Sequence, residues 1–173
     1  MLSVFLDCGP EDEALALSLA ALVPGAVDGL VREVVLFDRG MEAGARRVAD
    51  HAGCRVADGA AFRASIEGSR GEWLLFLEPG ARLKTGWIEA VVEHVERVGL
   101  GRGRVPAARF SPARGDRPGF LKRLVGGRRA LGDGLLLPKA QAIGLARTAR
   151  DLETAARGVA AERLGAEIRP RAR

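Results

Sequence analysis

The chain has 173 residues, of which 47% are hydrophobic and 28% charged, and its formal net charge is +5. This length suits one domain with a substantial core, and the composition excludes a disordered chain. The sequence has no Tyr and only 5% aromatic residues, which argues against a base-stacking surface and makes nucleic acid an unlikely partner. We therefore expect a single domain over residues 1–173.

The apolar start of the chain does not fit a membrane or secretory segment. Glu11, Asp12 and Glu13 interrupt it well before the roughly 18 apolar residues that a membrane span requires. No basic stretch precedes these acids, as it would in a signal peptide. We expect a cytoplasmic protein whose two cysteines, Cys8 and Cys54, are reduced.

Charge is distributed unevenly between the two halves of the chain. Residues 1–98 contain 10 Lys and Arg against 16 Asp and Glu, a net charge of −6, and residues 99–173 contain 17 against 6, a net charge of +11. A basic second half suits a pocket for a phosphorylated ligand, or peripheral contact with an anionic membrane face. A solvated arginine-rich surface would explain the same imbalance.

Strands and helices alternate regularly in the first half. Apolar runs predict strands at 2–6, 33–37, 54–57 and 73–77, and the intervening patterns predict helices from 10 to a stop at Pro24-Gly25, at 42–52, at 60–69 and at 87–98. Because right-handed crossovers return the chain to the same edge, this alternation predicts a parallel sheet. We therefore expect an α/β fold with three layers, α/β/α, around a Rossmann-like, mostly parallel central sheet.

The second half has a looser pattern. Beyond Gly99 a basic, loop-rich region precedes the last predicted elements. We expect strands at 105–110 and 135–137, a short amphipathic helix at 120–125, helices at 139–149 and 151–164 with Gly165 as a cap, and at most a strand in 167–173.

Three acids directly follow predicted strands, namely Asp7, Asp38 and Glu78. Open α/β sheets bind ligands at the carboxyl ends of their strands, so we expect these side chains to surround one cavity. Turns favour acidic residues in any case, which is the plainer explanation for each acid taken singly.

Several familiar motifs are missing from the sequence. No G-x-G-x-x-G follows the first strand, and neither a P-loop nor a G-x-S-x-G is present, which disfavours a dinucleotide cofactor and a serine-hydrolase elbow. The histidines, His51 and His94, have no partners at the spacing of a zinc site.

The order of features resembles the family 2 glycosyltransferases of the GT-A fold. LSVFLDCGPEDEALALSLAAL is similar to that family's first strand, nucleotide-contacting turn and first helix, and REVVLFDRGMEAGARRVADHAGCRV to its second strand, turn, helix and third strand. SRGEWLLFLEPGARLKTGWIEAVVEHV resembles the stretch with the metal-binding acids. LGDGLLLPK resembles the strand near the acceptor, and ARDLETAAR the segment with the catalytic acid.

The resemblance implies a transferase that moves a sugar from a nucleotide-diphosphate sugar to an unknown acceptor (a glycan, a lipid or a small molecule), with inversion. A carboxylate would deprotonate the acceptor, and a divalent cation, Mg²⁺ or Mn²⁺, would stabilise the leaving diphosphate. Residues 1–98 would form the nucleotide-binding half and residues 99–173 the acceptor side.

The same resemblance assigns roles to individual residues, which fall into catalytic, donor-binding and metal-binding groups. Asp151 or Glu153 would be the base, and Asp133 would orient the acceptor or the sugar. Glu78 would bind the metal. Asp7, Cys8 and Asp38 would meet the nucleoside of the donor. Its diphosphate would be met by Arg39, Arg63, Arg82 and some of the basic group from Arg102 to Arg129, because arginine offers a bidentate fork.

The chain departs from the family at the metal site. Gly80 stands where the family has a second metal-ligating Asp, and Pro79 fills the place between. Losing a carboxylate weakens a Mg²⁺ or Mn²⁺ site unless substrate phosphates and water compensate. An alternative function is therefore a glycosyltransferase-like module without catalysis, which regulates a partner or contacts an anionic membrane surface through its basic half.

Overall fold

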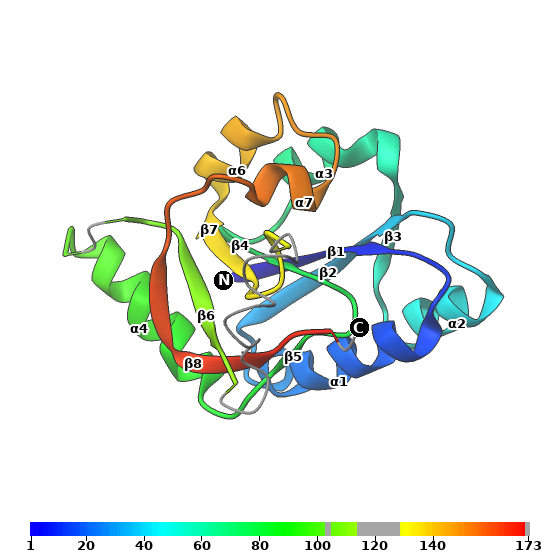
Figure 1. The fold of residues 1–173 in the computed structure, drawn as a ribbon, viewed down its shortest axis with the longest axis horizontal. Helices are drawn as coiled ribbons and strands as arrows, with labels where there is room; N and C mark the ends of the chain where they lie inside the picture. The colour runs from blue at the N-terminus through cyan, green and yellow to red at the C-terminus, as the bar shows by residue number, and fades with distance from the viewer. Residues whose placement is uncertain (103–104, 114–128, 172–173) are drawn as a thin grey trace, which may run out of the picture.

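The computed structural model describes residues 1–102, 105–113 and 129–171. The described strands form one sheet in the order β3-β2-β1-β4-β7-β6-β8-β5 (Figure 1). Their bounds are β1 (Leu2–Cys8), β2 (Val31–Asp38), β3 (Arg55–Asp58), β4 (Trp73–Leu77), β5 (Arg82–Leu83), β6 (Ala108–Pro112), β7 (Leu135–Pro138) and β8 (Glu162–Arg169). Four of the pairings between described strands are parallel, and they include all those among β3, β2, β1 and β4. The sheet is thus mostly parallel, as predicted.

Helices cover both faces of the sheet. Their bounds are α1 (Asp12–Val27), α2 (Ala43–His51), α3 (Phe62–Glu67), preceded by a short 3-10 turn, η1 (Gly59–Ala61), then α4 (Trp87–Gly99), α6 (Lys139–Leu145) and α7 (Leu152–Ala156). In Figure 1, α3, α6 and α7 gather at the top of the view and α1 lies below the sheet. The predicted three-layer α/β/α architecture is confirmed.

The two faces of the sheet carry separate apolar cores, because successive side chains on a strand alternate sides. Leu6 and Cys8 of β1 pack with Leu15 of α1 and Val91 of α4 in one core. The other core joins the remaining β1 and β4 side chains to α3, α6 and α7 through Phe5, Phe76, Phe62, Ala142 and Leu152. This alternation decides which way each side chain at the end of a strand points.

The predicted stop at Pro24-Gly25 is wrong, because α1 continues to Val27. The Asp28 amide still bonds to the Pro24 carbonyl at 2.9 Å, so the helical turn closes after the proline. Gly25 serves packing instead: a Cβ there would lie 2.5 Å from the Trp87 ring of α4. A bulky indole thus needs a glycine on the facing helix.

The predicted helix over 151–164 is also wrong in its second part. Helix α7 ends at Ala156, and Gly158 follows with φ +70°. Residues 162–169 form β8, in which Leu164, Ala166 and Ile168 are buried between more exposed neighbours. This period of two is typical of a strand, so Gly165 lies inside β8 rather than capping a helix.

Smaller differences concern bounds. The predicted strand at 105–110 is β6, shifted to Ala108–Pro112, and the predicted helices at 60–69 and 139–149 shorten to α3 and α6. The expected helix at 120–125 lies outside the described residues, as do most arginines of the basic region.

Gly71 tests the packing between the start of β4 and β1. A Cβ at Gly71 would approach the Ser3 amide nitrogen to 2.5 Å and the Leu2 carbonyl carbon to 2.8 Å, and both are backbone atoms that cannot move aside. Gly71→Ala should lower the free energy of unfolding by about 1–3 kcal/mol, the usual cost of overpacking. Urea denaturation followed by circular dichroism measures it.

Gly165→Ala is the matched control. A Cβ at Gly165 meets nothing within 4 Å, and alanine is favoured over glycine in a strand by roughly 0.5–1 kcal/mol. This variant should be at least as stable as the parent protein. Equal unfolding midpoints for the two variants would contradict the described contact between β1 and β4.

Candidate functional site

The carboxyl ends of β1 and β4 lie side by side. Leu6 pairs in register with Leu77, so Asp7 and Glu78 follow at the same level on neighbouring strands. Asp7 lies on the α7 face, where its Oδ2 accepts a hydrogen bond of 2.8 Å from the Leu152 amide. Glu78 follows Phe76 by two residues and forms an ion pair with Arg129, from the turn that leads into β7. The structure therefore brings these two predicted acids to one face.

Asp38 points to the opposite face. It pairs in register with Cys8, whose side chain packs in the α1 core, and its Oδ1 accepts from the amides of Gly40 at 2.9 Å and Met41 at 2.8 Å. Its other oxygen forms an ion pair with Arg46 of α2. These contacts, the Met41 amide first, hold the pKa of the Asp38 carboxyl below its usual range. The expectation that all three acids surround one cavity is therefore wrong for Asp38.

Arg39 fills the space over Asp7. Its Nε donates to Asp7 Oδ1 at 2.7 Å, and an NH2 group donates to the Arg150 carbonyl at 3.0 Å. The guanidinium carbon lies 6.0 Å from the centre of the Phe37 ring, and a Cβ on Gly59 would collide with this side chain. Arg39 thus runs from the β2 turn, across the end of β1, to the segment before α7.

Helix α7 carries the two acids predicted to be catalytic. Asp151 is its N-cap, with Oδ1 accepting from the Thr154 amide at 2.6 Å. Burial alone would raise the pKa of Asp151, but the Thr154 bonds and the nearby Arg39 and Arg157 guanidinium groups outweigh burial and lower it. Both oxygens of Glu153 accept from backbone amides, Ala130 at 2.7 Å and Leu131 at 3.1 Å.

Asp133 lies in the turn that Glu153 holds. It is 8% exposed, and its Oδ2 lies 2.9 Å from an NH2 group of Arg163 on β8. Its carbonyl accepts from the Phe110 amide at 3.0 Å, and Gly134 follows with φ +63° against Leu77. Asp133 is thus fixed between β4, β6 and β8, beside the edge that carries Glu78.

The segment after β4 is a tight turn. The Ala81 amide bonds to the Glu78 carbonyl at 3.0 Å, and Gly80 has φ +94° behind Pro79, which is the type II pattern of proline followed by glycine. Buried Ser18 of α1 fixes this turn from beneath, accepting from the Gly80 amide at 2.8 Å and donating to the Ala81 carbonyl at 2.9 Å. The sequence analysis missed Ser18, although a lone hydroxyl on an otherwise apolar helix is a signal.

Two predicted residues, Arg63 and Cys8, lie apart from this edge or face away from it, and a third, Arg82, follows the turn after Glu78. Arg63 is on α3 and pairs with Glu67 at 2.7 Å in a largely exposed contact. Cys8 faces the α1 core, and burial raises the pKa of its thiol to about 12. Cys54 is a free thiol as well, as expected. Arg82 lies on β5, two residues beyond Gly80, with its Nε buried and without a partner among the described residues.

The described residues do not fit a metal ion held by the protein. Across residues 1–102, 105–113 and 129–171, no group of three or more His, Cys, Asp and Glu side chains could hold one. Glu78, the predicted ligand, is already paired with Arg129, and its side chain is only 12% exposed.

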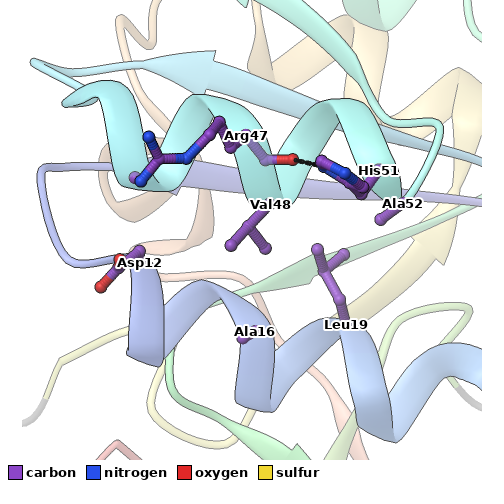
Figure 2. A pocket seen from close by; sticks show the side chains of 8 residues that line it. Asp12, Ala16, Leu19, Arg47, Val48, His51 and Ala52 are labelled. Atoms are coloured by element: carbon purple, nitrogen blue, oxygen red, sulfur yellow. Dashed lines mark hydrogen bonds between the residues drawn. The ribbon is translucent and has the colours of Figure 1, made fainter.

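A cavity of about 490 Å³ lies between α1 and α2, away from these acids. Figure 2 shows Val48 and Leu19 facing each other across it, with Asp12 at one end and His51 at the other. None of the predicted site residues lines this cavity. Among the described helices, none is long and apolar enough to cross a membrane.

No family model and no curated protein matches the sequence. Solved structures do match the fold. Glucosyl-3-phosphoglycerate synthase from Mycobacterium tuberculosis, in complex with Mn²⁺, UDP and glucosyl-3-phosphoglycerate, matches at 18% identity with a TM-score of 0.58, over 100% of this chain and 72% of that chain. The complex with Mn²⁺, UDP-glucose and phosphoglyceric acid matches at 17% identity with a TM-score of 0.61, over the same shares. The complex with Mg²⁺ and UDP matches at 19% identity with a TM-score of 0.58, again over these shares.

These neighbours are nucleotide-sugar glycosyltransferases of the GT-A type. At such identities the likeness shows the fold alone, and the metal ions, UDP and phosphoglyceric acid belong to those structures. This chain has a nucleotide-sugar glycosyltransferase-like fold of the GT-A type, as the sequence predicted.

Proposed function

We propose that this protein is a family 2 glycosyltransferase that transfers a sugar, with inversion, from a nucleotide-diphosphate sugar to an acceptor that is a glycan, a lipid or a small molecule. The observation that carries the proposal is the meeting of Asp7, Glu78 and α7 at the carboxyl ends of β1 and β4. Sheets of this kind bind ligands at that edge.

The donor would lie along this edge. Asp7 and the turn that Asp38 holds would meet the nucleoside, with Cys8 beneath them, and Asp133 would orient the sugar or the acceptor. Arg39 must leave Asp7 to admit the donor. This swing would break the ion pair with Asp7 and the bond to the Arg150 carbonyl, and it would deliver a guanidinium to the diphosphate.

Asp151 is the better candidate for the catalytic base. Glu153 uses both carboxylate oxygens for the backbone amides of the turn before β7, whereas Asp151 bonds to Thr154 within its own helix. The Asp151 carboxylate would take the proton from the acceptor hydroxyl as the acceptor oxygen bonds to the anomeric carbon. The bond from that carbon to the diphosphate breaks, and the nucleoside diphosphate leaves with the electron pair.

A second function has one specific observation in its favour. Asp7, Glu78 and Asp133 are each paired with an arginine of the same chain, so this edge satisfies its charges without a ligand. A catalytically inactive binding or regulatory module would look the same. Such a module would be cytoplasmic and would act at the inner face of the membrane. Salt-sensitive binding to anionic vesicles without sugar transfer would favour this function.

Donor binding tests the proposed pocket. Isothermal titration of UDP-glucose, GDP-mannose and dTDP-glucose, each with Mn²⁺, should find one donor that binds. Asp7→Asn should weaken that binding about tenfold or more, because the nucleoside loses the charged acceptor that Asp7 would offer it. Asp28→Asn, at the exposed far end of α1, is the matched control and should bind as the parent does. Failure of all three donors to bind would defeat the proposal.

Asp151→Asn tests the catalytic role separately from the structural one. Asparagine caps helices as well as aspartate does, so α7 should persist with an unchanged melting temperature. The loss of a general base should lower kcat by about 100- to 10,000-fold and leave KM for the donor unchanged. The measurement is the rate of nucleoside diphosphate release with the transferred acceptor. Undiminished kcat would exclude Asp151 as the base.

A further inference from the structure

An arginine occupies the place at Glu78 where a metal ion would bind. The Glu78 carboxylate is 12% exposed and lies beneath the Arg129 guanidinium, whose side chain is 58% exposed. A guanidinium has five N–H donors, and one ion pair leaves most of them free for a second anion. Glu78 thus anchors Arg129 and leaves its outer edge open to solvent.

The turn after β4 cannot supply a second carboxylate. Gly80 has φ +94°, which side-chain-bearing residues rarely adopt, and a Cβ there would meet Arg171 Cγ at 2.9 Å. Ser18 bonds to the adjoining backbone from beneath and holds the turn in this conformation. This turn therefore offers a Mg²⁺ or Mn²⁺ ion one carboxylate, that of Glu78, which is already paired with Arg129.

Two further guanidinium groups lie beside the same turn. Arg171 packs over Gly80 and bonds to Glu11, at the start of α1, at 2.6 Å. Leu83 of β5 packs in the α1 core, so alternation turns Arg82 to the other face, which Glu78 shares. Arg129 and Arg171, from distant parts of the chain, thus lie at this turn, and Arg82 directly follows it. The planar fork of arginine fits phosphate oxygens.

We propose that Arg129, anchored by Glu78 and assisted by Arg82 and Arg171, binds the diphosphate of the donor directly, so that binding requires no divalent cation. This inference rests on the proposed donor pocket, but it concerns the diphosphate alone. It predicts affinity for a bare diphosphate, whether or not a nucleoside is attached. Positive charge from guanidinium groups replaces the charge of a metal at this edge.

The experiment titrates two probes, inorganic pyrophosphate and UDP-glucose, each in EDTA and each with Mn²⁺. Both should bind in EDTA, with dissociation constants within about twofold of those in Mn²⁺. Arg129→Gln should weaken both about tenfold or more, because it removes a charge-assisted bidentate contact. Arg32→Gln is the matched control, since Arg32 is exposed near the start of β2, at the opposite edge of the sheet.

The outcomes separate this inference from the proposed function. Pyrophosphate binding in EDTA that Arg129→Gln weakens supports the inference, even if no nucleotide sugar binds and the transferase proposal fails. UDP-glucose binding that appears only with Mn²⁺ overturns the inference and leaves the transferase proposal intact. Equal weakening by Arg129→Gln and Arg32→Gln also overturns it, because the effect would then be general electrostatics. Binding of neither probe overturns the inference, and the transferase proposal falls with it only if GDP-mannose and dTDP-glucose also fail to bind.

Discussion

The candidate site is governed by ion pairs that join three of its acids to arginines from other elements of the chain. Arg39 closes on Asp7, Arg129 on Glu78 and Arg163 on Asp133. Without these partners, carboxylates crowded at one edge would repel one another and raise the cost of folding. Of these pairs, Arg129 with Glu78 joins the basic half of the sequence to the acidic half.

The sequence predicted the strands of the first half well, because buried parallel strands are uninterrupted apolar runs bounded by turns, as at 73–77. It failed where periodicity was ambiguous: the Ala-rich 151–164 stretch contains both helix-forming residues and the alternation of β8. It placed Asp7 and Glu78 on one edge, but it missed that Asp38 faces α2. The direction of a side chain at a strand end depends on register, which one sequence does not reveal.

The structure gives different contacts to the two acids of α7, which the sequence pattern does not distinguish. Asp151 and Glu153 stand two residues apart and look interchangeable in the sequence. Glu153 joins α7 to the turn before β7 with both oxygens, whereas Asp151 bonds to Thr154 within α7. Turning Glu153 toward an acceptor would break the bonds that hold the turn before β7. We therefore propose Asp151, rather than Glu153, as the base that deprotonates the acceptor.

Ser18 restricts which substitutions α1 can tolerate. Its neighbours Leu15, Leu19 and Leu22 contribute only apolar area to the core and can exchange for other aliphatic residues of similar volume. The hydroxyl cannot be replaced in this way, since it satisfies both the Gly80 amide and the Ala81 carbonyl in a setting without water. In relatives of this chain that keep the Pro79-Gly80 turn, we expect a polar residue at the position of Ser18 in an otherwise apolar helix.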